Sequence, residues 1–117
     1  MNILVLGDVF GPTGVKAIKE KLPEIIKDKK VDFVILNGEN AANNGVGISK
    51  QNTEDFFNSG TDVITSGNHI WDEKETMQFI NNEKRLLRPE NLLKPTAGKG
   101  FGIYNIKTAF FISNKKG

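Results

Sequence analysis

The chain lacks cysteine and has no long hydrophobic run. No disulfide or thiolate metal site can form without cysteine. The first apolar run, "ILVL", ends at Gly7 and Asp8 and is too short for a signal sequence or a membrane span. We therefore expect a cytoplasmic protein with no membrane partner.

An excess of charge of one sign is also missing. Sixteen Lys and Arg residues against fourteen Asp and Glu residues leave a net charge of +2 across 117 residues. The lysines are scattered and do not alternate with aromatic residues in a basic stripe, which argues against DNA as a partner. Length and composition, with 38% hydrophobic residues, fit one soluble domain at most.

Short β-branched runs alternate with longer amphipathic stretches. The runs predict buried parallel strands at 3–6, 33–36 and 62–65. The stretches predict helices from Pro12 or Thr13 to about 27, from about 49 to 58, and from Asp72 onward. We expect Pro23 to kink or split the first helix, and Asp72 with Glu75 to form a capping box for the third. The order βαβαβα predicts an α/β fold with a mostly parallel sheet.

The pattern weakens after Ile80. Three further strands are predicted: 86–91, stopped before Pro89, then 101–106 and 109–113. No helix follows the last of them before "NKKG" ends the sequence.

Polar side chains follow each of the first three predicted strands. They are Asp8 after the first, Glu39 and Asn40 after the second, and Asn68 and His69 after the third. Ligands of open α/β sheets bind beyond the carboxyl ends of the strands, so these groups are expected at one edge. Taken singly, each has a structural explanation as a helix cap or turn residue. A glycine precedes Asp8, Glu39 and Asn68, which we expect to bend the backbone and bring their oxygen atoms together.

Two nucleotide-loop motifs fail on the residues present. A dinucleotide fingerprint needs glycine where Val9 stands, and no Gly-Lys-Ser/Thr follows for a P-loop. The later glycine-rich stretch at 43–50 could hold an anion at a helix N-terminus or let a loop fold back. His69 is the only histidine, and a lone histidine is often a packed or surface residue.

Carboxylate, asparagine and imidazole ligands together suit Mn, Fe, Zn or Mg. The motifs "GDVFG", "NGENAANNGVG", "SGNHIWD" and "LLRPEN" resemble the N-terminal half of the bacterial YmdB-like branch of the calcineurin-type metallophosphoesterases. The resemblance runs from Met1 to about Ile106. It implies part of an α/β sandwich of metallophosphoesterase type.

The resemblance also implies a role for each strand-end residue. Asp8 corresponds to a ligand of the first of two divalent metals, Glu39 to the carboxylate bridging both, and Asn68 to a ligand of the second. Asn40 corresponds to a residue near the same cluster, and His69 corresponds to the catalytic histidine that stabilises the transition state or protonates the leaving oxygen. The implied activity is phosphodiester hydrolysis, with 2′,3′-cyclic mononucleotides as substrates.

Two departures from the family pattern qualify these expectations. Many calcineurin-type enzymes carry a histidine where Phe10 stands, although the YmdB-like branch lacks it too. The family completes its metal site with later histidines, including a Gly-His-Thr-His-like motif, and no histidine follows His69. We therefore expect 1–106 to be the N-terminal half of a metallophosphoesterase domain and 107–117 a divergent tail left by truncation or frameshift.

Such a fragment is expected to be inactive, so whether the chain itself is an enzyme stays open. It would bind at most one metal ion weakly, and its uncovered apolar surface would favour self-association, leaving a homo-oligomer open. The alternative is a non-catalytic flavodoxin-like module whose strand-end groups bind an anion or a protein partner.

Overall fold

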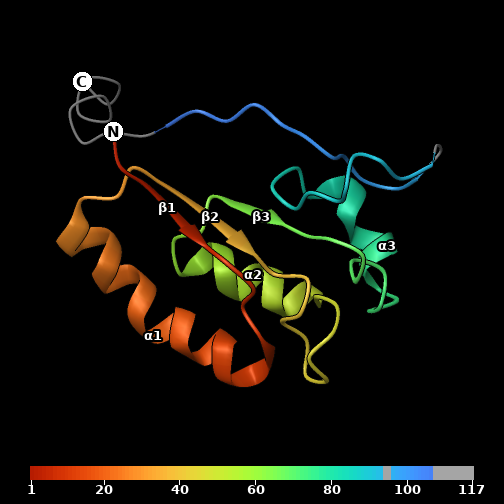
Figure 1. Cartoon of the computed structure of the whole chain (residues 1–117), viewed down its shortest axis with the longest axis horizontal. Coiled ribbons are helices and arrows are strands. Elements are labelled where there is room, and N and C mark those ends of the chain that lie inside the picture. Colours follow the sequence, from red (N-terminus) through yellow and green to blue (C-terminus); the bar gives the residue numbers. More distant parts are fainter. Residues whose placement is uncertain (94–95, 107–117) are drawn as a thin grey trace.

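Three parallel strands form the centre of the computed structural model, which describes residues 1–93 and 96–106. They are β1 (Ile3–Leu6), β2 (Phe33–Asn37) and β3 (Val63–Thr65), arranged in the order β1-β2-β3 (Figure 1). The three predicted strands are confirmed to within one residue at each end, and the sheet is parallel as expected.

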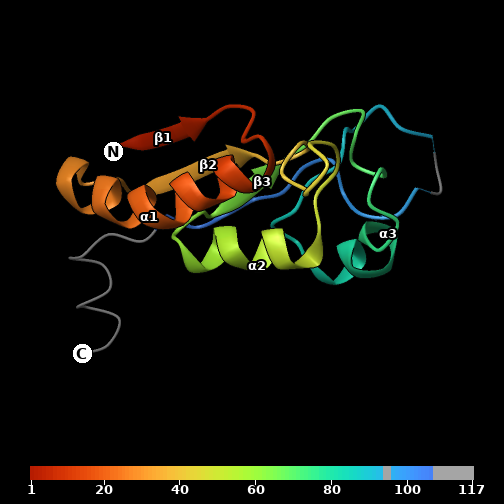
Figure 2. The ribbon, with the colours of Figure 1, turned by 90° about the horizontal axis from the view of Figure 1, so that it is seen from below.

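Two helices cover one face of this sheet. They are α1 (Gly11–Lys29), between β1 and β2, and α2 (Lys50–Asn58), between β2 and β3 (Figure 2). Successive right-handed crossovers that step across the sheet in one direction place their helices on the same side. The two helices accordingly contact each other beneath the strands.

The long helix α1 differs from the prediction at Pro23. The helix runs through this residue without ending, so the expected split is wrong. Pro23 is exposed, and the carbonyl of Lys19 that loses its helical hydrogen-bond donor can therefore bond water. Val15 and Leu22 point into the core as predicted, whereas Ile25, assigned to the same face, is 36% exposed.

Helix α2 begins and ends as the sequence predicts. The Ser49 hydroxyl accepts a hydrogen bond from the backbone N–H of Asn52, and the Asn52 side chain accepts one from the backbone N–H of Ser49, which closes a capping box. The chain leaves the helix at Gly60, whose φ of +113° requires glycine.

The predicted third helix is much shorter than expected and starts later. The structure has α3 (Thr76–Phe79) followed by the 3₁₀ turn η1 (Ile80–Asn82). The capping box at Asp72 is wrong, because the Asp72 carboxylate binds His69 and the Glu75 carboxylate accepts the backbone N–H of Lys50. Met77, expected inside, is 53% exposed.

Beyond η1 the chain adds single bridges to the sheet. Leu86 is buried and pairs in parallel with Ile64, and Leu87 pairs with Lys99. The strand predicted at 86–91 is therefore reduced to isolated bridges at Leu86 and Leu87. The strand predicted at 101–106 is wrong, because that segment is irregular and Ile103 is 95% exposed. The strand predicted at 109–113 lies outside the described residues.

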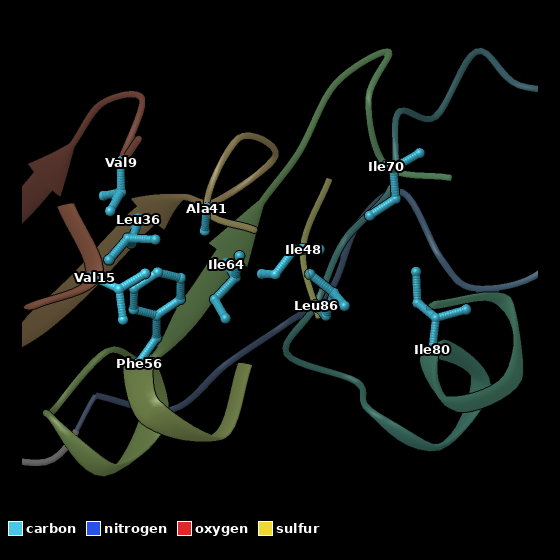
Figure 3. Packing of buried hydrophobic residues seen from close by; sticks show 10 residues of the cluster. All are labelled: Val9, Val15, Leu36, Ala41, Ile48, Phe56, Ile64, Ile70, Ile80 and Leu86. Carbon is cyan, nitrogen blue, oxygen red and sulfur yellow. The ribbon is translucent and has the colours of Figure 1, made fainter. Parts of the chain in front are cut away.

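One hydrophobic cluster joins the sheet, the helices and the later bridges. Figure 3 shows Phe56 of α2 beneath Leu36 and Ile64 of the strands, with Ile80 and Leu86 extending the cluster toward α3. Within residues 1–93 and 96–106, every helix is too short or too polar to span a lipid bilayer.

Candidate active site at the strand ends

The candidate residues lie at a single edge of the sheet. Because the strands are parallel neighbours, their carboxyl ends meet at that edge. Asp8 follows β1, Glu39 and Asn40 follow β2, and Asn68 and His69 follow β3. Hydrogen bonds link these loops across the edge.

Asp8 occupies a left-handed turn immediately beyond β1. Its φ is +38°, a region that aspartate enters more readily than most residues. The turn leaves the side chain exposed, and Oδ1 accepts a hydrogen bond of 2.7 Å from Nδ2 of Asn40. A backbone bond of 2.9 Å from Gly11 N–H to the Asn40 carbonyl holds the two loops together.

The other end of the Asn40 amide is buried and unpaired. Its Oδ1 has no hydrogen-bond partner among the described residues. A buried acceptor left without a donor costs about 1–3 kcal/mol, so the position favours a ligand that can bind this oxygen. Because Nδ2 already bonds Asp8, Oδ1 is the atom of this side chain that is available to coordinate a cation.

Glu39 lies between the second and third strand ends. Its Oε1 accepts a long hydrogen bond of 3.4 Å from Asn37, and its Oε2 accepts one of 3.3 Å from the backbone N–H of His69. The carboxylate rests directly on Gly67, where an added Cβ would lie 2.8 Å from Oε2 and even closer to Oε1.

Two of the three glycines before the site residues matter because of their small size. Gly7, Gly38 and Gly67 do not have a positive φ, so their backbone conformation does not itself require glycine. A Cβ on Gly38 would lie 3.0 Å from Ile48 Cδ1, and a Cβ on Gly67 would overlap the Glu39 carboxylate. A Cβ on Gly7 would meet nothing within 4 Å.

His69 is held at its backbone by Glu39 and at its ring by Asp72. Nδ1 lies 2.6 Å from Oδ2 of Asp72, and the histidine side chain is 36% exposed. Asn68 is exposed beside it. Sequence reasoning missed the role of Asp72, although its position three residues after His69 in "GNHIWD" is the signal that could have indicated it.

The glycine-rich loop at 43–50 folds back on itself, as one of the two alternatives for it expects. The N–H of Ala42 bonds the carbonyl of Gly47 at 2.9 Å. At the start of α2, Ser49 and Glu75 supply oxygen atoms to the N–H groups of Asn52 and Lys50. Two of the first N–H groups of α2 are thus bonded by the protein's own side chains, and anion binding at this end stays a prediction.

The donor types at this edge fit a hard divalent cation. Asp8 and Glu39 offer carboxylates, Asn40 and Asn68 offer amide oxygens, and His69 offers an imidazole, a set that suits Mg, Mn, Fe or Zn. Only two of these potential metal ligands, Asp8 and Glu39, are carboxylates. In the described ranges, no three His, Cys, Asp or Glu residues form a group that could hold a metal ion.

Comparison with known proteins identifies the family. A family model described as YmdB-like protein matches residues 4–117. The chain belongs to the YmdB-like family. This confirms the resemblance found in its motifs.

Two curated relatives carry names that point to phosphoester chemistry. This YmdB-like chain is 44% identical over 100 residues to the 2′,3′-cyclic-nucleotide 2′-phosphodiesterase of Bacillus subtilis (strain 168), covering 86% of the chain and 38% of that protein. It is 34% identical over 110 residues to a putative phosphatase/phosphodiesterase of Mycoplasma genitalium, covering 91% of the chain and 39% of that protein. The chain thus spans about two fifths of each relative's length.

Two crystal structures share the fold. A hypothetical protein from Thermus thermophilus superposes with a TM-score of 0.79 at 37% identity, covering 87% of this chain and 39% of that one. A Mycoplasma pneumoniae protein described as a novel phosphatase superposes with a TM-score of 0.76 at 28% identity, covering 97% and 49%. The predicted mixed α/β fold of metallophosphoesterase type is confirmed.

Proposed function

We propose that the strand-end edge is the N-terminal part of the active site of a metal-dependent phosphodiesterase. One observation carries the proposal: two hydrogen bonds connect residues that follow three different strands. Asn40 bonds Asp8, Glu39 bonds the backbone of His69, and the buried Asn40 Oδ1 is left without a donor among the described residues. A cation at this edge would satisfy that oxygen and balance the two carboxylates.

Each residue has a distinct proposed role. Asp8 and Asn68 would each hold one of two divalent ions, Glu39 would contribute its carboxylate to both, and Asn40 would contribute its free amide oxygen to the same cluster. Divalent ions of Fe, Mn, Zn or Mg, when bound, would polarise the phosphoryl oxygen and acidify the attacking water. His69 lies beside the cluster, where its ring stabilises the transition state or transfers a proton to the leaving oxygen.

The proposed substrates are phosphodiesters, with 2′,3′-cyclic mononucleotides as the first candidates. The support is the activity for which the Bacillus subtilis relative is named, together with the motifs that contain Asp8, Glu39, Asn68 and His69. We also propose that the protein has no DNA partner, on the basis of its scattered and balanced charge. A cytoplasmic location without a membrane partner remains part of the proposal.

The 117 residues alone are proposed to bind metal weakly and to lack turnover. Dinuclear sites need about four to six ligands per ion, and five side chains, two of them carboxylates, cannot fill two such shells. On this proposal residues 1–106 belong to one half of the domain, and the completed site needs histidines that these residues do not supply.

The experiment compares the chain with a version extended by the C-terminal region of the Bacillus subtilis relative. Both are titrated with Mn²⁺ by calorimetry and assayed on bis-p-nitrophenyl phosphate and 2′,3′-cyclic AMP. In the extended version, Asp8→Ala should lower metal binding and activity together. His69→Ala should retain the metal and lose about 10²–10⁴-fold in rate.

The exposed Asp28 at the end of α1 offers a matched control, because Asp28→Ala removes the same group far from the site. Robust turnover by the 117-residue chain that disappears in Asp8→Ala would overturn the proposed inactivity. If Mn²⁺ gives neither activity nor thermal stabilisation in the extended version, the flavodoxin-like binding module becomes the better explanation.

A further inference from the structure

The contact between His69 and Asp72 is short and direct. Nδ1 of the ring lies 2.6 Å from Oδ2 of the carboxylate, at the short end for a charge-assisted hydrogen bond. Both side chains are partly exposed, at 36% and 40%, so burial does not force them together.

The chemistry of the partner determines the state of the ring. An ionised carboxylate can only accept hydrogen bonds, so Nδ1 must carry the proton in this pair. The other ring nitrogen, Nε2, is then the one available to a substrate or a proton acceptor. A hydrogen bond at one nitrogen of histidine sets the role of the other in this way.

The local backbone holds Asp72 where the ring needs it. The N–H of Asp72 bonds the carbonyl of His69 at 3.0 Å, which closes a turn between them. Behind the turn lies Gly47, with a φ of +85°. A Cβ there would lie 2.8 Å from the backbone nitrogen of Glu73 and 3.3 Å from Cβ of Asp72. The glycine-rich loop thus packs closely against the back of the pair.

The backbone of His69 is held by a second carboxylate. Oε2 of Glu39 accepts its N–H at 3.3 Å, so the proposed bridging carboxylate and Asp72 hold the same residue at two points. The histidine is therefore set relative to the strand-end edge by its backbone and oriented by its side chain.

We propose that Asp72 is a positioning residue for His69: its carboxylate accepts the Nδ1 proton, fixes the plane of the ring and leaves Nε2 free for the reacting group. The catalytic part of this statement rests on the proposed function. The tautomer and the orientation do not, and they can be tested without activity.

The single histidine makes the test unambiguous. In the ¹⁵N-labelled chain, every imidazole signal of a long-range ¹H–¹⁵N spectrum belongs to His69. Spectra are recorded at a pH where these signals no longer move with added base, so that the ring is neutral. We expect Nδ1 to have the shift of a protonated nitrogen and Nε2 the shift of a bare one.

Two variants complete the test. Asp72→Asn replaces one acceptor oxygen with an amide N–H group and removes the negative charge that favours a proton on Nδ1. The share of rings with the proton on Nε2 should therefore rise. Glu73→Gln removes the neighbouring carboxylate, which has no bond to the ring in the described structure, and should leave the spectrum unchanged. In the extended version, Asp72→Asn should lower kcat by about 10- to 100-fold with KM nearly constant, as the loss of an orienting partner does.

The wild-type spectrum alone can overturn the proposal, even if Asp72→Asn fails to fold. A neutral ring with its proton on Nε2, or a spectrum identical in the wild type and Asp72→Asn, would show that Asp72 does not set the tautomer. Failure of the proposed function is separate: the extended wild type would then hydrolyse no phosphodiester while the tautomer of its histidine still followed Asp72.

Discussion

The two faces of the sheet differ sharply although the same strands make both. On the face covered by α1 and α2, Leu36 and Ile64 are completely buried. On the opposite face of β1, Ile3 is 51% exposed and Val5 is 67% exposed. Alternate residues of a strand point to opposite faces, so one short apolar run supplies a closed core and an open surface.

The candidate site depends on the closed face. Gly38, just before Glu39, packs against Ile48, Phe56 and Ile64, all of which are fully buried. The open face is covered in part by Tyr104, whose ring lies 6.2 Å from that of Phe33. The buried residues on the helix-covered face are therefore enough to position the strand ends, and the opposite face of the sheet remains available for further contacts.

The largest predicted effect is in the closed core. Phe56→Ala should destabilise the chain by about 3–5 kcal/mol, because it removes a fully buried ring beneath β2 and β3. Phe101→Ala is the matched control, since that ring is 68% exposed and its loss should cost less than about 0.5 kcal/mol. Urea unfolding followed by circular dichroism measures both. Equal losses would contradict the comparison of faces.

The next effect is expected where the core meets the site. Gly67→Ala places a methyl group against the Glu39 carboxylate and should cost about 1–3 kcal/mol. It should also weaken Mn²⁺ binding measured by calorimetry, because Glu39 must move. Gly7→Ala adds the same methyl group in open space and should change neither quantity. Unchanged binding in Gly67→Ala would argue against Glu39 as a ligand.

The sequence pattern correctly predicted the helices and strands that depend on residues close together in the sequence. β-Branched runs located the three strands, and the second helix was predicted at about 49–58, where the structure closes its start with the local capping box of Ser49 and Asn52. Pro23 misled because its effect depends on whether its ring faces solvent. The start of the third helix was predicted too early because the Asp72 carboxylate, which could cap a helix, instead bonds the imidazole ring of His69. The outcome at such positions is decided by tertiary contacts.

The site divides in the same way. Parallel strands in sequence order were enough to predict that Asp8, Glu39 and Asn68 share one edge. The close packing around these residues was not predictable, because the sequence does not show which side chain will lie against a given glycine. Gly67 is required by the carboxylate that rests on it, and only the folded chain brings Glu39 to that position.

A smaller effect is predicted on the open face at Tyr104. Burial, aided by Glu83 and opposed by Arg85, raises the pKa of this phenol above its ordinary value of 10.0. The folded chain therefore holds the proton more tightly than the unfolded chain does. This contribution is complete below about pH 10 and is lost as the pH rises through the folded-state pKa.

Tyr104→Phe should remove that alkaline dependence. It should also cost about 0.5–1.5 kcal/mol at neutral pH, because the hydroxyl no longer donates its 2.7 Å hydrogen bond to the carbonyl of Lys84. Urea unfolding at pH 7 and at a pH above about 10 gives both quantities. If stability declines equally with pH in the two proteins, Tyr104 does not carry the effect.

The smallest change in stability is expected at Val5, where self-association should change instead. Val5 is exposed on β1, which lies at the edge of the sheet, and an open apolar edge strand favours pairing between copies. Val5→Lys adds a charge that opposes such pairing and removes no buried contact, so it should alter stability by less than about 0.5 kcal/mol. Sedimentation velocity should show less association than in the wild type.

Met77→Lys adds the same charge at a 53% exposed residue of α3 and should leave association unchanged. If both variants reduce association equally, net charge rather than the open face governs it; if Val5→Lys unfolds the chain, this face is more closed than its exposure indicates.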